Sequence, residues 1–531
     1  MKRVRPRVDV NLPELDQVLE QARQTPLSDP DYQKLKDTLH LLVGLLQPTA
    51  RSTEKTSAVL AEAGTPVPAV SEATEKKAAP GHGRNGAAAF TGAQKVVIAH
   101  ADLQSGQGCP ACEQGKVYHQ KEPKPLVRIV GQAPLAATVY ELERLRCNAC
   151  GQVFTATEPD GIGPEQYDET TGAMIAQLKY GSGVPFYRLE KLQASLGIPL
   201  PASTQWEIAE ESAELLQPAW QELIRQGAQG EVVYNDDTRM RVLRLAREPS
   251  DSRTGVFTSG IVSTKQGQQI ALYFTGRQHA GENLADVLRA RAAELPPPIQ
   301  MCDALSRNMP KLASGVEILL ANCLAHGRRQ FVDLVPNFPA ECRYVLEQLG
   351  RVYGYEAAAR ERGLTATERL IFHQQHSAPV LEELHRWLEA QLAQKKTEPN
   401  SSLGQAITYL LRHWRGLTTF LREKNAPLDN NLCERSLKRA VLHRKNALFY
   451  RTLHGAEVGD LFMSLIHSCE LCGAHAFDYL TELQKHAAEL ACQPARWMPW
   501  NYRQAVQALE AKGEQQSHEE TQERPRAGGA H

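Results

Sequence analysis

The chain has 531 residues, 42% of them hydrophobic, and a formal net charge of −1. Overall charge therefore does not indicate a nucleic-acid partner, and any basic surface must be local. Its eleven cysteines are too sparse for a disulfide scaffold. No apolar core follows the basic start MKRVRPRVDV, and no run of about 18 apolar residues occurs. We therefore expect a cytoplasmic protein of several domains, with no membrane span.

The N-terminal part divides into a helical segment and a linker. Residues 1–47 carry leucines at helical spacing. This pattern fits a hairpin that packs on its own protein, and equally an appendage that dimerises or binds DNA ends. Residues 48–96 are rich in Ala, Gly, Pro and Thr and predict a flexible linker.

Residues 97–158 contain two CxxC motifs separated by short strand-like segments. Four thiolates at this spacing predict a zinc ribbon with a structural Zn²⁺ ion, held by Cys109, Cys112, Cys147 and Cys150. His119 is a spare ligand at most, because four cysteines complete the shell. The alternative is a redox pair, which usually needs a single CxxC at a helix start.

Residues 159–228 read as helices broken at Gly181–Gly183 and Gly197–Pro199. The helix–turn–helix pattern is compatible with DNA contact, and also with a helical lead-in that packs on the next domain.

A catalytic core is predicted to begin in residues 229–335. A short buried strand, Val232–Tyr234, precedes Asp236 and Asp237, and a later strand ends at Asp303. Two further strands are expected between 254 and 276, with turns at Ser259-Gly260 and Gln266-Gly267. Since strand ends gather at one edge of a sheet, these acids are expected to converge.

Residues 336–427 predict an all-helical insertion of three helices. Its histidines are expected to be packed or solvated rather than ligands, namely His373, His376, His385 and His413. Residues 457–510 predict C-terminal helices, in which Cys469 and Cys472 imitate a metal site but are expected to be buried. The tail, 511–531, is predicted to be disordered.

The segment 428–456 combines one acid with a basic run. Glu434 lies in the first turn of a predicted helix that opens at Asp429, Asn430 and Asn431. No acid then occurs until after Ala456, whereas six Lys or Arg do. Glu434 and Lys438 are also spaced as an ordinary i,i+4 surface pair. The basic side chains either hold DNA phosphates or pair with acidic surface elsewhere.

Three motifs resemble one known family. DNNLCER followed by RKNALF resembles the signature of the insertion-sequence sixty-six (IS66) transposases, and so do Asp236-Asp237-Thr238 and the block CLAHGRRQF from Cys323 to Phe331. The resemblance implies an α/β (α+β) ribonuclease-H-like core, with the helical insertion between its second and third acids. It also implies an Asp-Asp-Glu triad: Asp236, Asp303 and Glu434. Asp237 stands where the family has Glu, and Arg439 where many relatives have Pro.

The resemblance further implies metal-dependent DNA cleavage and strand transfer at terminal inverted repeats. The carboxylates would hold Mg²⁺ or Mn²⁺, which prefer oxygen ligands. Expected partners are double-stranded DNA, further copies of the chain and small accessory proteins, in a nucleoid-associated setting. The residues expected at DNA are Lys438, Arg439, Arg444, Lys445, Arg328 and Arg329. Two alternatives remain: an inactive zinc-ribbon DNA-binding relative, and a nuclease without joining activity.

Overall fold

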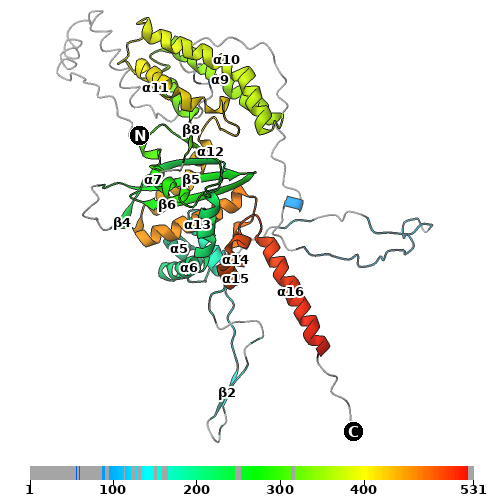
Figure 1. Cartoon of the computed structure of the whole chain (residues 1–531). Coiled ribbons are helices and arrows are strands. Elements are labelled where there is room, and N and C mark those ends of the chain that lie inside the picture. Colours follow the sequence, from blue (N-terminus) through cyan, green and yellow to red (C-terminus); the bar gives the residue numbers. More distant parts are fainter. Residues whose placement is uncertain are drawn as a thin grey trace, which may run out of the picture. The chain divides into compact units, whose positions relative to one another are not determined.

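The computed structural model (Figure 1) describes three long ranges, residues 165–245, 253–312 and 317–523. Before residue 165 it describes shorter stretches: residues 56, 59, 87–89, 95–112, 114–120, 126–128, 133–146, 148, 152–157 and 159. Two compact units are formed. One comprises Met1–Pro68, Arg328–Ala358 and Pro379–Ile407, and the other comprises Ala69–Gly327, Ala359–Ala378 and Thr408–His531.

The second unit contains a five-stranded mixed sheet with the order β6-β5-β3-β7-β8. The strands are β3 (Val232–Met240), β5 (Val256–Lys265), β6 (Gln268–Gly276), β7 (Ile299–Cys302) and β8 (Leu319–Asn322). Consecutive strands β3, β5 and β6 pair antiparallel, whereas β7 runs parallel to β3, and β8 runs parallel to β7. The expectation of a core that combines a mixed β-sheet with helices is confirmed.

Two expectations for the strands need correction. β3 does not end before the acids but continues through Asp236 and Asp237 to Met240, paired with β5. The expected turn at Ser259-Gly260 is absent, because β5 runs unbroken through both residues. The turn at Gln266-Gly267 is confirmed, and both of its residues have positive φ. Gly260 does not form a turn. Its missing side chain instead allows the helix that carries Leu437 to pack closely on the strand.

The outer strand β6 is covered by helix α13 (Leu453–Leu471). Outward-facing backbone N–H groups of an edge strand have no partner within the sheet, and they can pair with another chain. Here alternate N–H groups of β6 donate to side chains one turn apart on α13: Ala271 to Ser468, Tyr273 to Ser464 and Thr275 to Asp460. Helix α13 therefore provides acceptors for the N–H groups of the edge strand. These hydrogen bonds also fix the position of the helix along the sheet.

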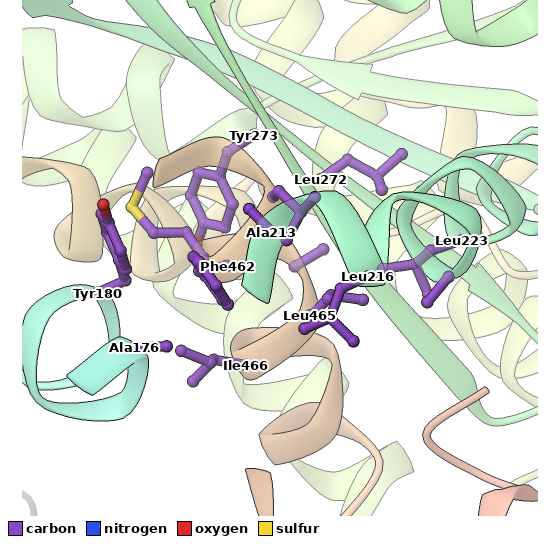
Figure 2. Packing of buried hydrophobic residues seen from close by; sticks show 14 of the residues in the cluster. Ala176, Tyr180, Ala213, Leu216, Leu223, Leu272, Tyr273, Phe462, Leu465 and Ile466 are labelled. Carbon is purple, nitrogen blue, oxygen red and sulfur yellow. The ribbon is translucent and has the colours of Figure 1, made fainter. Parts of the chain in front are cut away.

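A buried apolar cluster joins this helix to the sheet and to the preceding helices (Figure 2). These are α4 (Glu169–Ala176), the π-helical turn η2 (Gln177–Gly181), α5 (Phe186–Ser195) and α6 (Ala202–Gly227). Figure 2 shows Leu216 of α6, Leu272 of β6 and Phe462 of α13 in the cluster. Tyr180 stacks on Phe462, with ring centroids 5.3 Å apart. The predicted helices of this region thus form part of the core around the sheet.

The three helices expected between the second and third acids are present as α9 (Pro339–Glu361), α10 (Ala366–Ala393) and α11 (Ser402–Leu417). Tyr344 of α9 stacks on Trp387 of α10, with centroids 4.7 Å apart. His373 is buried and lies 2.8 Å from the Ser377 hydroxyl, so it is packed as expected. Among the helices that the structure describes, none has the length and apolar character of a membrane span.

The remaining elements include the helix that carries Glu434. They are η1 (Ala87–Ala89), β1 (Arg144–Arg146), β2 (Val153–Thr155), β4 (Val242–Arg244), α7 (Ala280–Leu288), η3 (Ser306–Asn308), α8 (Leu324–Leu334), η4 (Thr419–Leu421), α12 (Asn431–Ala447), β9 (Tyr450–Thr452), α14 (Ala476–Lys485), α15 (Ala487–Cys492), η5 (Pro494–Trp497) and α16 (Tyr502–Glu523). Cys469 is buried, and Cys472 donates to the carbonyl of Gln269, so both cysteines pack as expected.

Only part of the predicted zinc ribbon is described. β1 and β2 pair antiparallel, and Cys109 and Cys112 form a turn in which the N–H of Cys109 donates to the Gly115 carbonyl. Cys147 and Cys150 lie outside the described residues, as do the predicted helices of 1–47 and most of the linker. Backbone N–H groups of Gln114 and Gly115 lower the pKa of Cys112, which favours a thiolate ligand there.

Candidate functional site

Two of the predicted acids come together on neighbouring parallel strands. Tyr234 of β3 is the register partner of Met301 of β7, and Asp236 and Asp303 each follow two residues later. Residues two apart on a strand share a face, so both carboxyl groups lie on one side of the sheet at one level. The side-chain amide of Asn308 donates to Oδ1 of both aspartates, at 3.2 Å from Asp236.

The proximity of the two aspartates changes their electrostatics. Burial, and then the neighbouring charge of Asp303, raises the pKa of Asp236 to about 7. Hydrogen bonds from the Asp237 backbone and from Asn308 act in the opposite direction, but they are weaker. Two carboxylates that cannot easily both ionise form a site at which a cation would relieve the repulsion.

Asp237 belongs to the opposite face of the strand. Its Oδ2 lies 2.8 Å from Nδ1 of His279, the residue before α7, and its Oδ1 lies 3.3 Å from Arg307. Asp237 is therefore held by His279 and Arg307, whereas Asp236 faces Asp303. The sequence left open which of the two aspartates would serve as a metal ligand, and this geometry favours Asp236 for such a role.

A buried amide network, which sequence reasoning missed, positions Asn308. Nε2 of Gln300 on β7 donates to Oδ1 of Asn235 and to the backbone carbonyl of Asn308. Nδ2 of Asn235 donates to the same carbonyl. These amides hold η3 against β3 and β7, so the donor that joins the two aspartates has a fixed location. No local sequence pattern marks this network, because Asn235 lies 65 positions from Gln300 and 73 positions from Asn308.

The third predicted acid is carried by α12, which packs on the same strand. Gly260, the register partner of Asp236, gives the helix room: a Cβ there would lie 2.9 Å from Cδ2 of Leu437. The thiol of Cys433 donates to the Gly260 carbonyl and also lies at the backbone N–H of Asp236. The residue next to Glu434 is therefore in contact with the strand that carries Asp236.

The start of α12 differs from the expected cap. Asn430 is the N-cap residue, but its side chain makes no capping hydrogen bond. Its Nδ2 instead donates to the carbonyl of Asn235, and its backbone N–H donates to Sγ of Cys323. Asn430 thus ties the first turn of the helix to β3 and to the end of β8.

The carboxylate of Glu434 meets two residues of the block CLAHGRRQF. Its Oε1 lies 3.7 Å from Nδ1 of His326, and both side chains are partly exposed. Ligand atoms of Cys323, His326 and Glu434 all lie within 4.8 Å of one another. Cys323 follows β8, whose last residue, Asn322, is the register partner of Cys302, so Cys323 is level with Asp303. The structure therefore assembles Asp236 with Asp303, and Glu434 with Cys323 and His326.

The basic residues of α12 differ in their surroundings. Lys438 and Lys445 are exposed. Arg444 donates to the hydroxyl of Thr238 and to the carbonyl of Arg239, which places it beside the strand of Asp236. Arg439 is bound to Glu470 and to the Gly181 carbonyl, and burial lowers its pKa. Arg439 is thus part of the packing around α12.

The remaining arginines expected at DNA lie on α8. Arg328 and Arg329 are both partly exposed. Arg328 donates to the hydroxyl of Thr56, 3.3 Å away, within its own unit. Their side chains therefore have protein partners in this structure.

The sheet order, the aspartate pair and the basic helix beside it define a mixed α/β protein whose site suits nucleic-acid processing. The sequence model described as "Transposase IS66 family" matches residues 165–458, more than half of the chain. The chain belongs to the IS66 transposase family, which implies DNA as a partner and suggests the use of divalent metal.

Similar proteins occur in Sinorhizobium fredii (strain NBRC 101917 / NGR234). The uncharacterized protein y4jD is 29% identical over 375 residues, which cover 68% of this chain and 71% of the relative. The uncharacterized protein y4hP is 25% identical over 394 residues, covering 69% and 68% of the two chains. These relatives add no function beyond that of the family.

Proposed function

We propose that the protein is an Asp-Asp-Glu transposase, which cleaves DNA at the ends of an insertion sequence and joins them to a target. The observation that carries this proposal is the pair Asp236 and Asp303, level on adjacent parallel strands, with α12 anchored to the same strand. The order β6-β5-β3-β7-β8, with only the first three strands antiparallel, supports a ribonuclease-H-like fold.

The carboxyl groups present fit a hard divalent cation. Asp236 and Asp303 offer oxygen ligands, which Mg²⁺ and Mn²⁺ prefer, and the raised pKa of Asp236 reflects a repulsion that a cation would remove. When bound, such ions activate an attacking oxygen and stabilise the leaving oxygen in phosphoryl transfer. Asp236, Asp303 and Glu434 are the residues that would hold them.

The chain's own groups prepare this site before any ion binds. Asn308 fixes the two aspartates at one level, and the amides of Asn235 and Gln300 hold Asn308 in turn. Asp237, in contact with His279 and Arg307, supports the opposite face of the strand. Rigid support of this kind keeps ligands near their productive geometry.

DNA contact is proposed for the basic side chains beside the site. Lys438 and Lys445 are exposed on the helix that carries Glu434, and Arg444 lies next to Thr238. Such residues bind phosphates and set the register of DNA without reading its sequence. Arg328 and Arg329 are proposed as further contacts. Assembly of several copies on two DNA ends, with small accessory proteins, belongs to the same proposal.

A structural Zn²⁺ ion held by Cys109, Cys112, Cys147 and Cys150 is also proposed. Backbone N–H groups of Gln114 and Gly115, just after the turn at Cys109–Cys112, lower the pKa of Cys112, as expected for a thiolate ligand. So small a ribbon depends on its metal for folding, because it buries little apolar surface.

A strand-transfer assay tests the proposed activity. Full-length protein is incubated with Mg²⁺, a target plasmid and pre-cleaved DNA that carries the element's end. Joined product supports the transposase. Cleavage of uncut ends without joining would indicate a nuclease, and binding alone would indicate an inactive DNA-binding relative.

Glu434→Gln is the decisive variant in this assay. It keeps the size of the side chain and removes one ligand charge, so DNA binding is expected to persist while joining falls by at least about a hundredfold. Glu457→Gln, an exposed acid on α13, is the matched control and should retain activity. Equal joining by Glu434→Gln and wild type would remove Glu434 from the site.

A further inference from the structure

The proposed transposition chemistry uses Glu434 but leaves Cys323 and His326 without a role. These residues come from separate elements: Cys323 follows β8, His326 lies in the first turn of α8, and Glu434 lies in the first turn of α12. Segments more than 100 positions apart thus bring a thiol, an imidazole and a carboxylate within 4.8 Å of one another. Three different ligand types at one point require an explanation.

We propose that Cys323, His326 and Glu434 form a binding site for a thiophilic divalent ion such as Zn²⁺, separate from the Mg²⁺ ligands Asp236 and Asp303. Thiolate and imidazole select Zn²⁺ or Co²⁺, whereas Mg²⁺ requires oxygen ligands. Three protein ligands leave a fourth position open for water or for a DNA oxygen.

The separation between the His326 and Glu434 ligand atoms fits a tetrahedral ion. With metal–ligand bonds of about 2.0–2.3 Å, neighbouring ligand atoms lie roughly 3.3–3.7 Å apart. Nδ1 of His326 and Oε1 of Glu434 are 3.7 Å apart, and every ligand pair lies within 4.8 Å.

Two further observations indicate a ligand at this place. Nδ1 of His326 is buried and has no hydrogen-bond partner. Sγ of Cys323 accepts a hydrogen bond from the backbone N–H of Asn430 at the start of α12, and the backbone N–H of His326 in the first turn of α8 also points to it. These N–H groups favour a thiolate, but burial outweighs them and raises the pKa of the Cys323 thiol. A bound ion would therefore have to displace the thiol proton.

The site has a regulatory consequence that rests on the proposed function. Glu434 is both the third carboxylate of the Mg²⁺ site and a ligand of the Zn²⁺ site. Zn²⁺ binding would hold the Glu434 carboxylate toward His326, so micromolar Zn²⁺ is expected to inhibit Mg²⁺-dependent joining. His326→Gln should weaken this inhibition at least tenfold, because it removes one ligand and leaves Glu434 in place.

Cobalt binding tests the site itself. Full-length protein saturated with zinc, then cleared of loose metal with a weak chelator, is assayed for zinc per chain and titrated with Co²⁺. The wild type should carry one zinc more per chain than His326→Gln, or bind one Co²⁺ more with thiolate-to-cobalt absorption. Cys323→Ser should lose the same ion. Cys472→Ser, whose thiol donates to the Gln269 carbonyl, is the matched control and should keep it.

The outcomes separate the site from the proposed function. Equal metal content and equal cobalt absorption in wild type and His326→Gln would overturn the site, whatever the joining assay shows. A difference in metal content with no joining by the wild type would keep the site and reject the transposase. If Cys323→Ser fails to fold by thermal unfolding, His326→Gln decides, because its side chain is partly exposed.

Discussion

Asp236 and Asp303 stand level on adjacent parallel strands, and one side-chain amide, that of Asn308, donates to both carboxyl groups. An amide nitrogen has two hydrogens, so each aspartate receives one of them. The arrangement keeps two mutually repelling acids close together in the absence of a cation. The protonation of Asp236 therefore depends on the charge of Asp303 and on the hydrogen bond from Asn308.

Asp236→Asn should stabilise the metal-free protein and abolish joining. The pKa of Asp236 is about 7 in the folded chain, above its ordinary value of 3.8. The folded state therefore binds the extra proton between these values, and its stability falls as pH rises through about 7. Asparagine carries no charge at any of these pH values, so the variant does not lose stability in this way. At pH 8 its midpoint of thermal unfolding should exceed that of wild type by roughly 2–4 °C, the shift that 1 kcal/mol produces in a large domain.

The control for this variant is the same measurement at lower pH and with metal. At pH 5 wild-type Asp236 is protonated, so the difference should shrink. Mg²⁺ should stabilise the wild type at pH 8 and leave Asp236→Asn unchanged. A variant that is less stable than wild type at pH 8 would show that the charge on Asp236, beside Asp303, does not destabilise the folded protein.

Asn308→Ala should move the pH dependence of activity upward. The hydrogen bond from Asn308 lowers the pKa of Asp236, so its loss should raise that pKa above about 7. Joining at pH 7 should fall and recover in part at pH 9. The matched control is Asn283→Ala, a buried amide on α7 that donates to Ser259 on the other face of the sheet. It should lower stability without shifting the pH profile. A profile for Asn308→Ala that parallels that of wild type would exclude Asn308 as a positioning residue.

The site was predictable from sequence where the pattern is local. The buried run before Asp236 and the strand before Asp303 are short and apolar, so both acids could be assigned to strands of one sheet. Their exact level could not be assigned, because it depends on the register of Tyr234 with Met301, 67 positions apart. The assignment of Glu434 came from the resemblance of its motif, since an acid in a first helical turn is common.

Other features depend on contacts that no local pattern encodes. Asn308 follows its strand in a short helical turn, and only the buried amides of Asn235 and Gln300 reveal its role. Gly260 follows a serine, as turn glycines often do, yet it lies inside a strand that pairs with β3 on one side and β6 on the other, and Leu437 packs against it. Tertiary packing overrode the local turn preference there.

Gly260→Ala should disturb the site through α12. The added methyl group would lie 2.9 Å from Cδ2 of Leu437, and overpacking of this kind costs about 1–3 kcal/mol. The helix must shift from β3, so joining should fall together with stability. Gly276→Ala, where a Cβ would meet nothing within 4 Å, is the control.

A second substitution sharpens the Gly260 prediction. Leu437→Ala alone leaves a cavity and should cost about 2–5 kcal/mol. Combined with Gly260→Ala, it supplies the space that the new methyl group needs. The free energy of unfolding lost by the double variant should therefore be smaller than the sum of the two single losses. If the losses in the free energy of unfolding were strictly additive, Leu437 and Gly260 would not be in direct packing contact.

The basic residues of α12 should separate into those that bind DNA and those that stabilise the fold. Lys438 and Lys445 are exposed, so replacement of either by alanine should weaken binding and reduce the salt dependence of log Kd by about 0.9 for each phosphate that the variant no longer binds. Arg439 is held by Glu470 and the Gly181 carbonyl. Arg439→Ala should therefore lower the midpoint of thermal unfolding and leave the salt slope unchanged. Binding measured by fluorescence anisotropy across salt concentrations distinguishes the two groups. A reduced slope for Arg439→Ala at unchanged stability would place Arg439 at the DNA instead.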